Sequence, residues 1–262
     1  MRTKINIKKI AAIAGVMLLT STGIIALTLK YHRKPVTAAV AKSHKPLEDV
    51  VDTALLRKFS GLLKTMDFNK NSFTYSGKYN ITDGKDTTNN IHDLFFLFCR
   101  QGKNFYSKIG NNEIINENGI NVYIEHDQKK IVISHNAYQI KQGITDLGQL
   151  AGNIKGESYQ LVNNVSGTCK KISLLNEHHI TCKEMSVTYD TLTNTLSNIR
   201  LRLTDFSDPL NNKKDRAVGI DFTRLSDRSH MSSYPRIRDI IKYTNGKINA
   251  APAYAAYELI TL

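Results

Sequence analysis

Residues 121–134, NVYIEHDQKKIVIS, contain two alternating apolar runs on either side of a polar centre. In one register Val122 faces Ile133, and two residues further on Ile124 faces Ile131. Side chains alternate between the two faces of a strand, so these four side chains would share one face. The stretch therefore predicts an antiparallel hairpin with one apolar face, and a half-buried antiparallel sheet around it.

The polar centre of this hairpin contains Glu125, His126 and Asp127, which together resemble an acid–base group. The same register places the turn between Asp127 and Gln128 and opposes Glu125 to Lys130, a favourable cross-strand charge pair. A tip that projects into water lacks the burial that shifts pKa values in catalytic sites. We therefore interpret these residues as the polar tip of a hairpin.

No other stretch has a recognisable catalytic or metal-binding pattern. The sequence has no glycine-rich phosphate loop, no serine-nucleophile motif and no zinc-protease histidine pair. His178 and His179 are adjacent, so in a strand they point to opposite faces and suit a turn better than a shared metal ion. We predict no cofactor and no metal. A non-enzymatic protein is the expectation, with a hydrolase of unrecognised site as the alternative.

The remaining segments predict an α+β fold. Apolar residues recur every three or four positions over residues 46–66, which predicts an amphipathic helix. FTYSGKYNI (73–81) alternates with period two, and further short strand-like runs follow it at turn-length spacing. A short internal helix is predicted from Thr145 to Gly156. Together these elements predict a curved, unclosed antiparallel sheet covered by the two helices, in one domain over residues 46–262.

Residues 10–29, IAAIAGVMLLTSTGIIALTL, contain no charge and predict a transmembrane anchor. About 20 residues at roughly 1.5 Å each span the hydrocarbon core of a bilayer. A basic tail (1–9) precedes this segment and a charged linker (30–45) follows it. A cleaved signal peptide is the alternative, with Ala39–Ala41 as its cleavage site. The greater positive charge before the apolar segment favours a cytoplasmic N-terminus.

The net charge of +13 is concentrated near the anchor. Residues 1–45 hold nine Lys or Arg and no acid, whereas 27 basic and 23 acidic residues make up the rest. No nucleic-acid-binding motif accompanies this charge, so we predict no nucleic-acid partner.

The three cysteines leave at least one thiol unpaired within the chain. Cys99 ends the apolar run LFFLFC and is predicted to be a buried thiol. Cys169 and Cys182 flank a predicted hairpin whose turn would centre between Leu175 and Asn176. They form either a disulfide in an oxidising compartment or two separate core thiols.

In the order of its elements the chain resembles the lipoprotein-carrier fold (LolA/LolB-like). The resemblance lies in one helix followed by FTYSGKYNI, FFLFCRQGKNFYSKI and NVYIEHDQKKIVIS, and it covers residues 46–230. It implies an unclosed barrel whose concave face holds acyl chains beneath a helical lid. The predicted anchor and the absence of Trp depart from this family. The apolar sheet face that would contact the ligand comprises Phe73, Tyr75, Tyr79, Phe96, Phe98, Phe105, Val122, Ile124, Ile131 and Ile133.

These features lead to one expected function and one alternative. We expect a non-enzymatic, single-pass protein of the bacterial inner membrane, with its C-terminal domain in the periplasm. Its sheet would bind lipid, acyl chains or a lipidated partner of the cell envelope. The alternative is a structural subunit of a trans-envelope assembly, in which the same domain has a filled core and binds protein.

Overall fold

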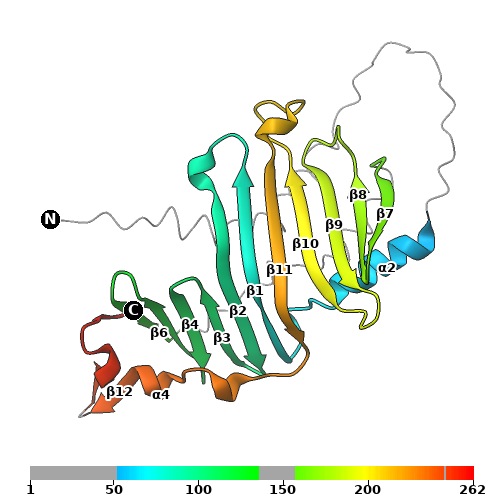
Figure 1. The fold of residues 1–262 in the computed structure, drawn as a ribbon. Coiled ribbons are helices and arrows are strands. Elements are labelled where there is room, and N and C mark those ends of the chain that lie inside the picture. Colours follow the sequence, from blue (N-terminus) through cyan, green and yellow to red (C-terminus); the bar gives the residue numbers. More distant parts are fainter. Residues whose placement is uncertain (1–51, 136–156, 245) are drawn as a thin grey trace, which may run out of the picture.

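A computed structural model describes residues 52–135, 157–244 and 246–262 (Figure 1). The predicted basic tail, anchor, linker and internal helix (1–9, 10–29, 30–45 and 145–156) lie outside the described residues. Among the helices that are described, none is both long and apolar enough to cross a membrane.

The described residues form one mostly antiparallel, twelve-stranded sheet. Its strand order is β14-β6-β5-β4-β3-β2-β1-β11-β10-β9-β8-β7. The first six strands are β1 (Ser72–Asp83), β2 (Ile91–Gln101), β3 (Asn104–Ile109), β4 (Asn112–Glu117), β5 (Ile120–Glu125) and β6 (Lys130–Ser134). The others are β7 (Gln160–Ser166), β8 (Cys169–Leu175), β9 (Cys182–Asp190), β10 (Leu196–Leu203), β11 (Arg216–Ser226) and β14 (Glu258–Thr261). Strands β14 and β7 form its two edges, so the sheet is open and curved, as predicted (Figure 1).

The hairpin formed by β5 and β6 has the predicted register. Val122 pairs with Ile133, Ile124 pairs with Ile131, and Glu125 stands opposite Lys130. This agreement follows from the strict alternation of apolar side chains, because a slip by one residue would expose all of them.

Helix α2 (Thr53–Lys64) covers part of the sheet on one face. Its N-terminus is capped by Asp52, whose carboxylate accepts a hydrogen bond of 2.9 Å from the backbone NH of Leu55. Phe59, Leu62 and Leu63 are buried. The prediction of a helix over 46–66 is confirmed for this part. The helix ends two residues before the predicted position, and its predicted start lies outside the described residues.

The chain after β11 forms a second cover, on the opposite face of the sheet. We call it the C-terminal segment (231–262). It contains the helices η3 (Met231–Ser233), α4 (Ile237–Ile240) and η4 (Pro252–Tyr254), the two-stranded hairpin β12 (Ile241–Thr244) and β13 (Lys247–Ala250), and β14. Two further short helices, η1 (Thr87–Asn89) and η2 (Asn212–Lys214), lie in turns between sheet strands. The last strand, β14, pairs parallel to β6.

The sheet therefore separates two hydrophobic cores. The helix-side core joins α2 to strands β1, β2, β3 and β8–β11, and includes Phe59, Tyr75 and Val187. The C-terminal core joins the C-terminal segment to strands β2–β6, and includes Ile131 and Ile240. The two covers also lie over different parts of the sheet, α2 beside β7–β9 and α4 beside β3–β6 (Figure 1).

The prediction of a single apolar sheet face is wrong, because the ten predicted ligand-binding residues divide between the two cores. Cross-strand pairing places Thr74, Cys99, Tyr106, Ile115, Val122 and Ile133 in one row on one face. Tyr75 and Phe98, one residue out of phase, lie on the other face. The helix-side core holds Phe73, Tyr75, Tyr79, Phe96, Phe98 and Phe105, and the C-terminal core holds Val122, Ile124, Ile131 and Ile133.

Of the two alternatives for Cys169 and Cys182, the structure has two separate thiols, and the predicted turn position is wrong. Leu175 pairs with Glu184 and Cys169 pairs with Asp190, so the turn is centred near His179 rather than at the predicted position. Cys169 and Cys182 then lie at opposite ends of the hairpin, roughly 25 Å apart at about 3.3 Å per residue. A disulfide needs Cα atoms within about 7 Å. All three cysteines are free, and Cys99 is buried as predicted.

Candidate functional site

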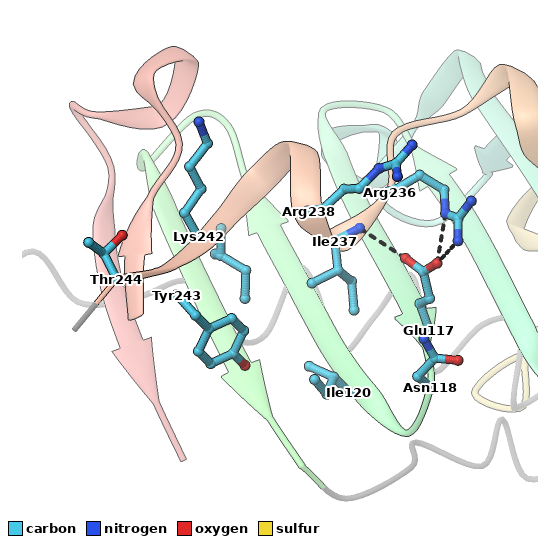
Figure 2. Close-up of a pocket in the computed structure, with 10 residues that line it drawn as sticks. Glu117, Asn118, Ile120, Arg236, Ile237, Arg238, Lys242, Tyr243 and Thr244 are labelled. Atoms are coloured by element: carbon cyan, nitrogen blue, oxygen red, sulfur yellow. Dashed lines mark hydrogen bonds and ion pairs between the residues drawn. The ribbon is translucent and has the colours of Figure 1, made fainter. Parts of the chain in front are cut away.

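A groove lies between the β4–β5 turn and the C-terminal segment (Figure 2). Its volume is about 580 Å³. We call it the C-terminal groove. It is lined by Glu117, Asn118, Ile120, Arg236, Ile237, Arg238, Ile241, Lys242, Tyr243 and Thr244.

The first wall is built by the tight turn between β4 and β5. Asn118 and Gly119 form its two central residues, with φ angles of 54° and 81°. Asn and Gly at such positions are typical of a two-residue hairpin turn whose twist matches the strands. This turn fixes Glu117 at the end of β4, on the face that α4 covers.

Glu117 connects the β4–β5 turn to the C-terminal segment, which forms the second wall of the groove. Its carboxylate accepts a hydrogen bond of 2.7 Å from Nε of Arg236, a second from Nη2 of Arg236, and one of 3.2 Å from the backbone NH of Ile237 (Figure 2). The Arg236 guanidinium holds the pKa of Glu117 below its usual value, against the opposing effect of burial. The contact between sheet and C-terminal segment is therefore charged at this point.

The second wall follows from the sequence PRIRDIIKY, residues 235–243. The backbone NH of Arg236 donates a 2.8 Å hydrogen bond to Asp239, which starts the single turn of α4. Ile237, Ile240 and Ile241 are buried against the sheet. The residues between and after them point away from the core, and Tyr243 remains 58% exposed.

The groove combines an apolar floor with a cationic rim. The partly exposed Ile120 and the ring of Tyr243 supply most of the apolar surface, whereas Ile237 and Ile241 are only 8% and 2% exposed beneath them. The rim carries Arg236, Arg238 and Lys242, of which Arg236 is held by Glu117. The side chain of Arg238 is 81% exposed and lies 4.0 Å from Asp239. Lys242 has no ion pair among the described residues. Such a surface suits an amphiphile with an anionic head.

His126 and Asp127, at the polar centre of the β5–β6 hairpin, bind different partners. Nε2 of His126 lies 3.2 Å from Oε1 of Glu113, and its Nδ1 lies 2.8 Å from the hydroxyl of Tyr257. His126 is therefore partly covered by the C-terminal segment, and the prediction that the whole tip projects into solvent is wrong for this residue. Asp127 accepts a 2.9 Å hydrogen bond from Asn111 instead of orienting the imidazole.

His178 and His179 lie in the turn between β8 and β9, where hydrogen bonds hold His179 in place. Nε2 of His179 lies 3.1 Å from Glu157, while its Nδ1 accepts a 3.0 Å hydrogen bond from the backbone NH of Cys182. His178 is exposed beside it. Over residues 52–135, 157–244 and 246–262, no cluster of three or more His, Cys, Asp or Glu side chains is placed to bind a metal ion.

The sequence reasoning did not single out the residues of the C-terminal groove. The alternation of Arg and Ile in RIRDII was the available indication, because it separates a cationic side from an apolar one over one helical turn. Neither the protein-family models nor the curated proteins compared with this sequence give a match.

Proposed function

We propose that this chain is a membrane-tethered, non-enzymatic protein of the cell envelope that binds an anionic lipid, or the lipid of a lipidated partner, in the C-terminal groove. The tether is the apolar segment 10–29, and the groove is on the extracytoplasmic domain. The observation that carries the proposal is the combination of an apolar floor and three cationic side chains in one groove.

The size and chemistry of the groove agree with this ligand. A volume of about 580 Å³ lies within the range of small-molecule sites. Each CH₂ removed from water contributes about 0.8 kcal/mol. Each Lys or Arg near an anionic head group contributes about 1 kcal/mol. Lys242 has no ion pair in the described structure, and Arg238 has only the 4.0 Å contact with Asp239, so both are available for that role.

This proposal moves the ligand away from the sheet faces. The aromatic residues first expected to contact it are at most 9% exposed, because α2 and neighbouring side chains fill the space beside them. The filled faces favour a second candidate function, an interaction subunit of a trans-envelope assembly. In that case the same groove binds a protein segment with acidic and apolar side chains.

Native mass spectrometry of the full-length chain, released from detergent, tests the proposal. Lipid bound around the anchor is retained by every variant. The readout is therefore the difference between variants in the amount of lipid bound. In Arg238→Ala/Lys242→Ala we expect affinity for added phosphatidylglycerol to fall roughly 30-fold, from about 1 kcal/mol for each charge. The control Lys213→Ala/Arg224→Ala removes two exposed charges elsewhere and should leave the affinity unchanged.

Two other results decide between the candidates. Equal lipid retention in both double variants contradicts the lipid proposal. Loss of a co-purifying envelope protein in the groove variant alone, with lipid retention unchanged, favours the interaction subunit.

A further inference from the structure

A second pocket lies on the polar face of the sheet, over the middle of β1, β11, β10, β9 and β8. Its volume is about 360 Å³. This face is the reverse of the one that carries the helix-side core. We call it the sheet pocket. It is lined by Asn80, Thr82, Lys171, Thr188, Asn198, Arg200, Ala217, Val218, Gly219 and Asp221.

The floor of the sheet pocket is low because β11 places small residues there. A Cβ atom added at Gly219 would meet no neighbour closer than Cβ of Asn80, at 3.9 Å. Its backbone φ also lies outside the region that demands glycine. Neither packing nor backbone conformation therefore requires glycine at this position, and its effect is to leave space between Asn80 and Arg200.

One wall of the pocket holds a fixed carboxylate. Asp221 accepts hydrogen bonds from the side-chain amides of Asn198, at 2.7 Å, and Asn80, at 3.3 Å. The nearby lysines have other partners, since Lys78 pairs with Asp93 at 3.3 Å and Lys171 pairs with Glu184 at 2.8 Å. Within the described part of the chain, Asp221 has no ion pair. Each of its oxygens keeps acceptor capacity beyond the single amide that it binds.

The adjacent wall holds an unpaired cation. Arg200 is exposed and makes no hydrogen bond or ion pair with any described residue. It pairs across the strands with Gly219, and Asn198, two residues earlier, pairs with Asp221. Arg200 and Asp221 are thus diagonal neighbours, with Cα atoms about 7–8 Å apart. Two opposite charges line one pocket without contacting each other.

We propose that the sheet pocket binds a small zwitterion. The anionic group of the ligand binds the guanidinium of Arg200, which accommodates a carboxylate or phosphate through two parallel hydrogen bonds. Its ammonium group donates to the carboxylate of Asp221, which the two amides hold in place. The ligand thereby joins the two charges across the floor left by Gly219. A free amino acid and phosphoethanolamine both have this chemistry.

The site is independent of the C-terminal groove. Its residues belong to β1, β8, β9, β10 and β11, whereas the groove lies beyond β4 and β5 at the other end of the sheet. Loss of lipid binding in the groove would leave the sheet pocket intact, so the two proposals fail separately.

Equilibrium dialysis of the full-length chain in detergent micelles tests the proposal, with radiolabelled glycine and O-phosphoethanolamine as probes. We expect saturable binding of at least one probe with Kd at or below about 1 mM. Acetate and methylammonium carry one charge each and should bind at least tenfold more weakly. If glycine binds more tightly, the ligand is a free amino acid. If O-phosphoethanolamine binds more tightly, the ligand is a phosphoethanolamine group. Absence of saturable binding by both, or acetate binding as tightly as glycine, would overturn the proposal.

Three variants and one control locate the binding. Arg200→Gln and Asp221→Asn each remove one charged hydrogen-bonding partner, and each should weaken the zwitterion at least tenfold. Gly219→Ala places a methyl group on the pocket floor and should weaken binding while the chain remains folded. Arg224→Gln lies on the same face of the sheet outside the pocket and should bind as the wild type does. Unchanged affinity in Arg200→Gln contradicts the assignment.

Discussion

Phe98 and Cys99 are consecutive residues of β2, yet their side chains lie in different hydrophobic cores. The ring of Phe98 stacks on Phe105 in the helix-side core, with centroids 6.3 Å apart. On the other face of the sheet, Sγ of Cys99 lies 3.3 Å from Oγ1 of Thr74, in the C-terminal core. Both residues are at most 9% exposed. Strand β2 is therefore buried on both faces at this point, and each face has a different cover.

This arrangement predicts that the two covers can be loosened separately. Phe59 of α2 and Ile240 of α4 are both fully buried. Phe59→Ala and Ile240→Ala should each lower the free energy of unfolding by about 2–5 kcal/mol, because each leaves a cavity. Hydrogen exchange should rise in α2 for the first variant and in α4 and β12 for the second. Equal increases over both covers in both variants would show that the two cores open together.

Local patterns were sufficient to predict most strands of the large sheet and the β5–β6 hairpin, but not β4, β12 and β13, and not which face each strand presents. The alternation in NVYIEHDQKKIVIS determined its register, because one slip would expose four apolar residues. Whether Tyr75 and Val122 share a face of the sheet depends on the registers of all the strand pairs between them, through β2, β3 and β4. No short sequence pattern encodes that combination of registers. The β8–β9 register was also predicted wrongly, since the polar turn around His179 permits several centres.

The corrected β8–β9 register predicts how the cysteines react. Burial raises the pKa of Cys182 to about 12, with further contributions from neighbouring groups. Because thiolate is the reactive form, Cys182 should resist iodoacetamide at pH 8 in the folded chain. The partly exposed Cys169 should be alkylated. Peptide mapping after oxidation should show no Cys169–Cys182 disulfide, and full alkylation in denaturant serves as the control. Recovery of that disulfide would contradict the register.

The contact between Glu117 and Arg236 predicts acid sensitivity. The pKa of Glu117 is lower in the folded chain than its usual value of about 4.3, so folding is favoured by its ionised form. This stabilisation is fully present above about pH 4.3 and is lost as the pH falls through the lower folded pKa. Glu117→Gln should therefore lower stability by about 1–2 kcal/mol at pH 7, and the difference should shrink in acid. Urea unfolding across pH 3–7 measures it, with the exposed Glu258→Gln as the control.

Two buried hydroxyls should respond to removal in opposite ways. Oγ of Ser186 is buried and has no hydrogen-bond partner in the described part of the chain. Ser186→Ala should be neutral or stabilise by up to about 1 kcal/mol, because it removes an unsatisfied polar group. Oγ1 of Thr74 donates to the carbonyl of Arg228 and accepts from the backbone NH of His230. Thr74→Ala should destabilise by about 1–3 kcal/mol. Chemical unfolding of both variants checks the contrast, and equal losses would contradict it.

Gly77 and Gly219 lie on the neighbouring strands β1 and β11 and differ in the space that a side chain would have. At Gly77 of β1 an added Cβ would lie 2.0 Å from the backbone carbonyl oxygen of Asp221, where β1 and β11 shift register. At Gly219 of β11 the nearest atom would be 3.9 Å away. Gly77→Ala should thus separate the two strands locally and cost about 2–3 kcal/mol or more. Gly219→Ala should remain within about 1 kcal/mol of the wild type, with a gain from reduced freedom of the unfolded chain. Thermal and urea unfolding of the two variants measure the difference, and a destabilised Gly219→Ala would show that its Cβ meets an obstruction.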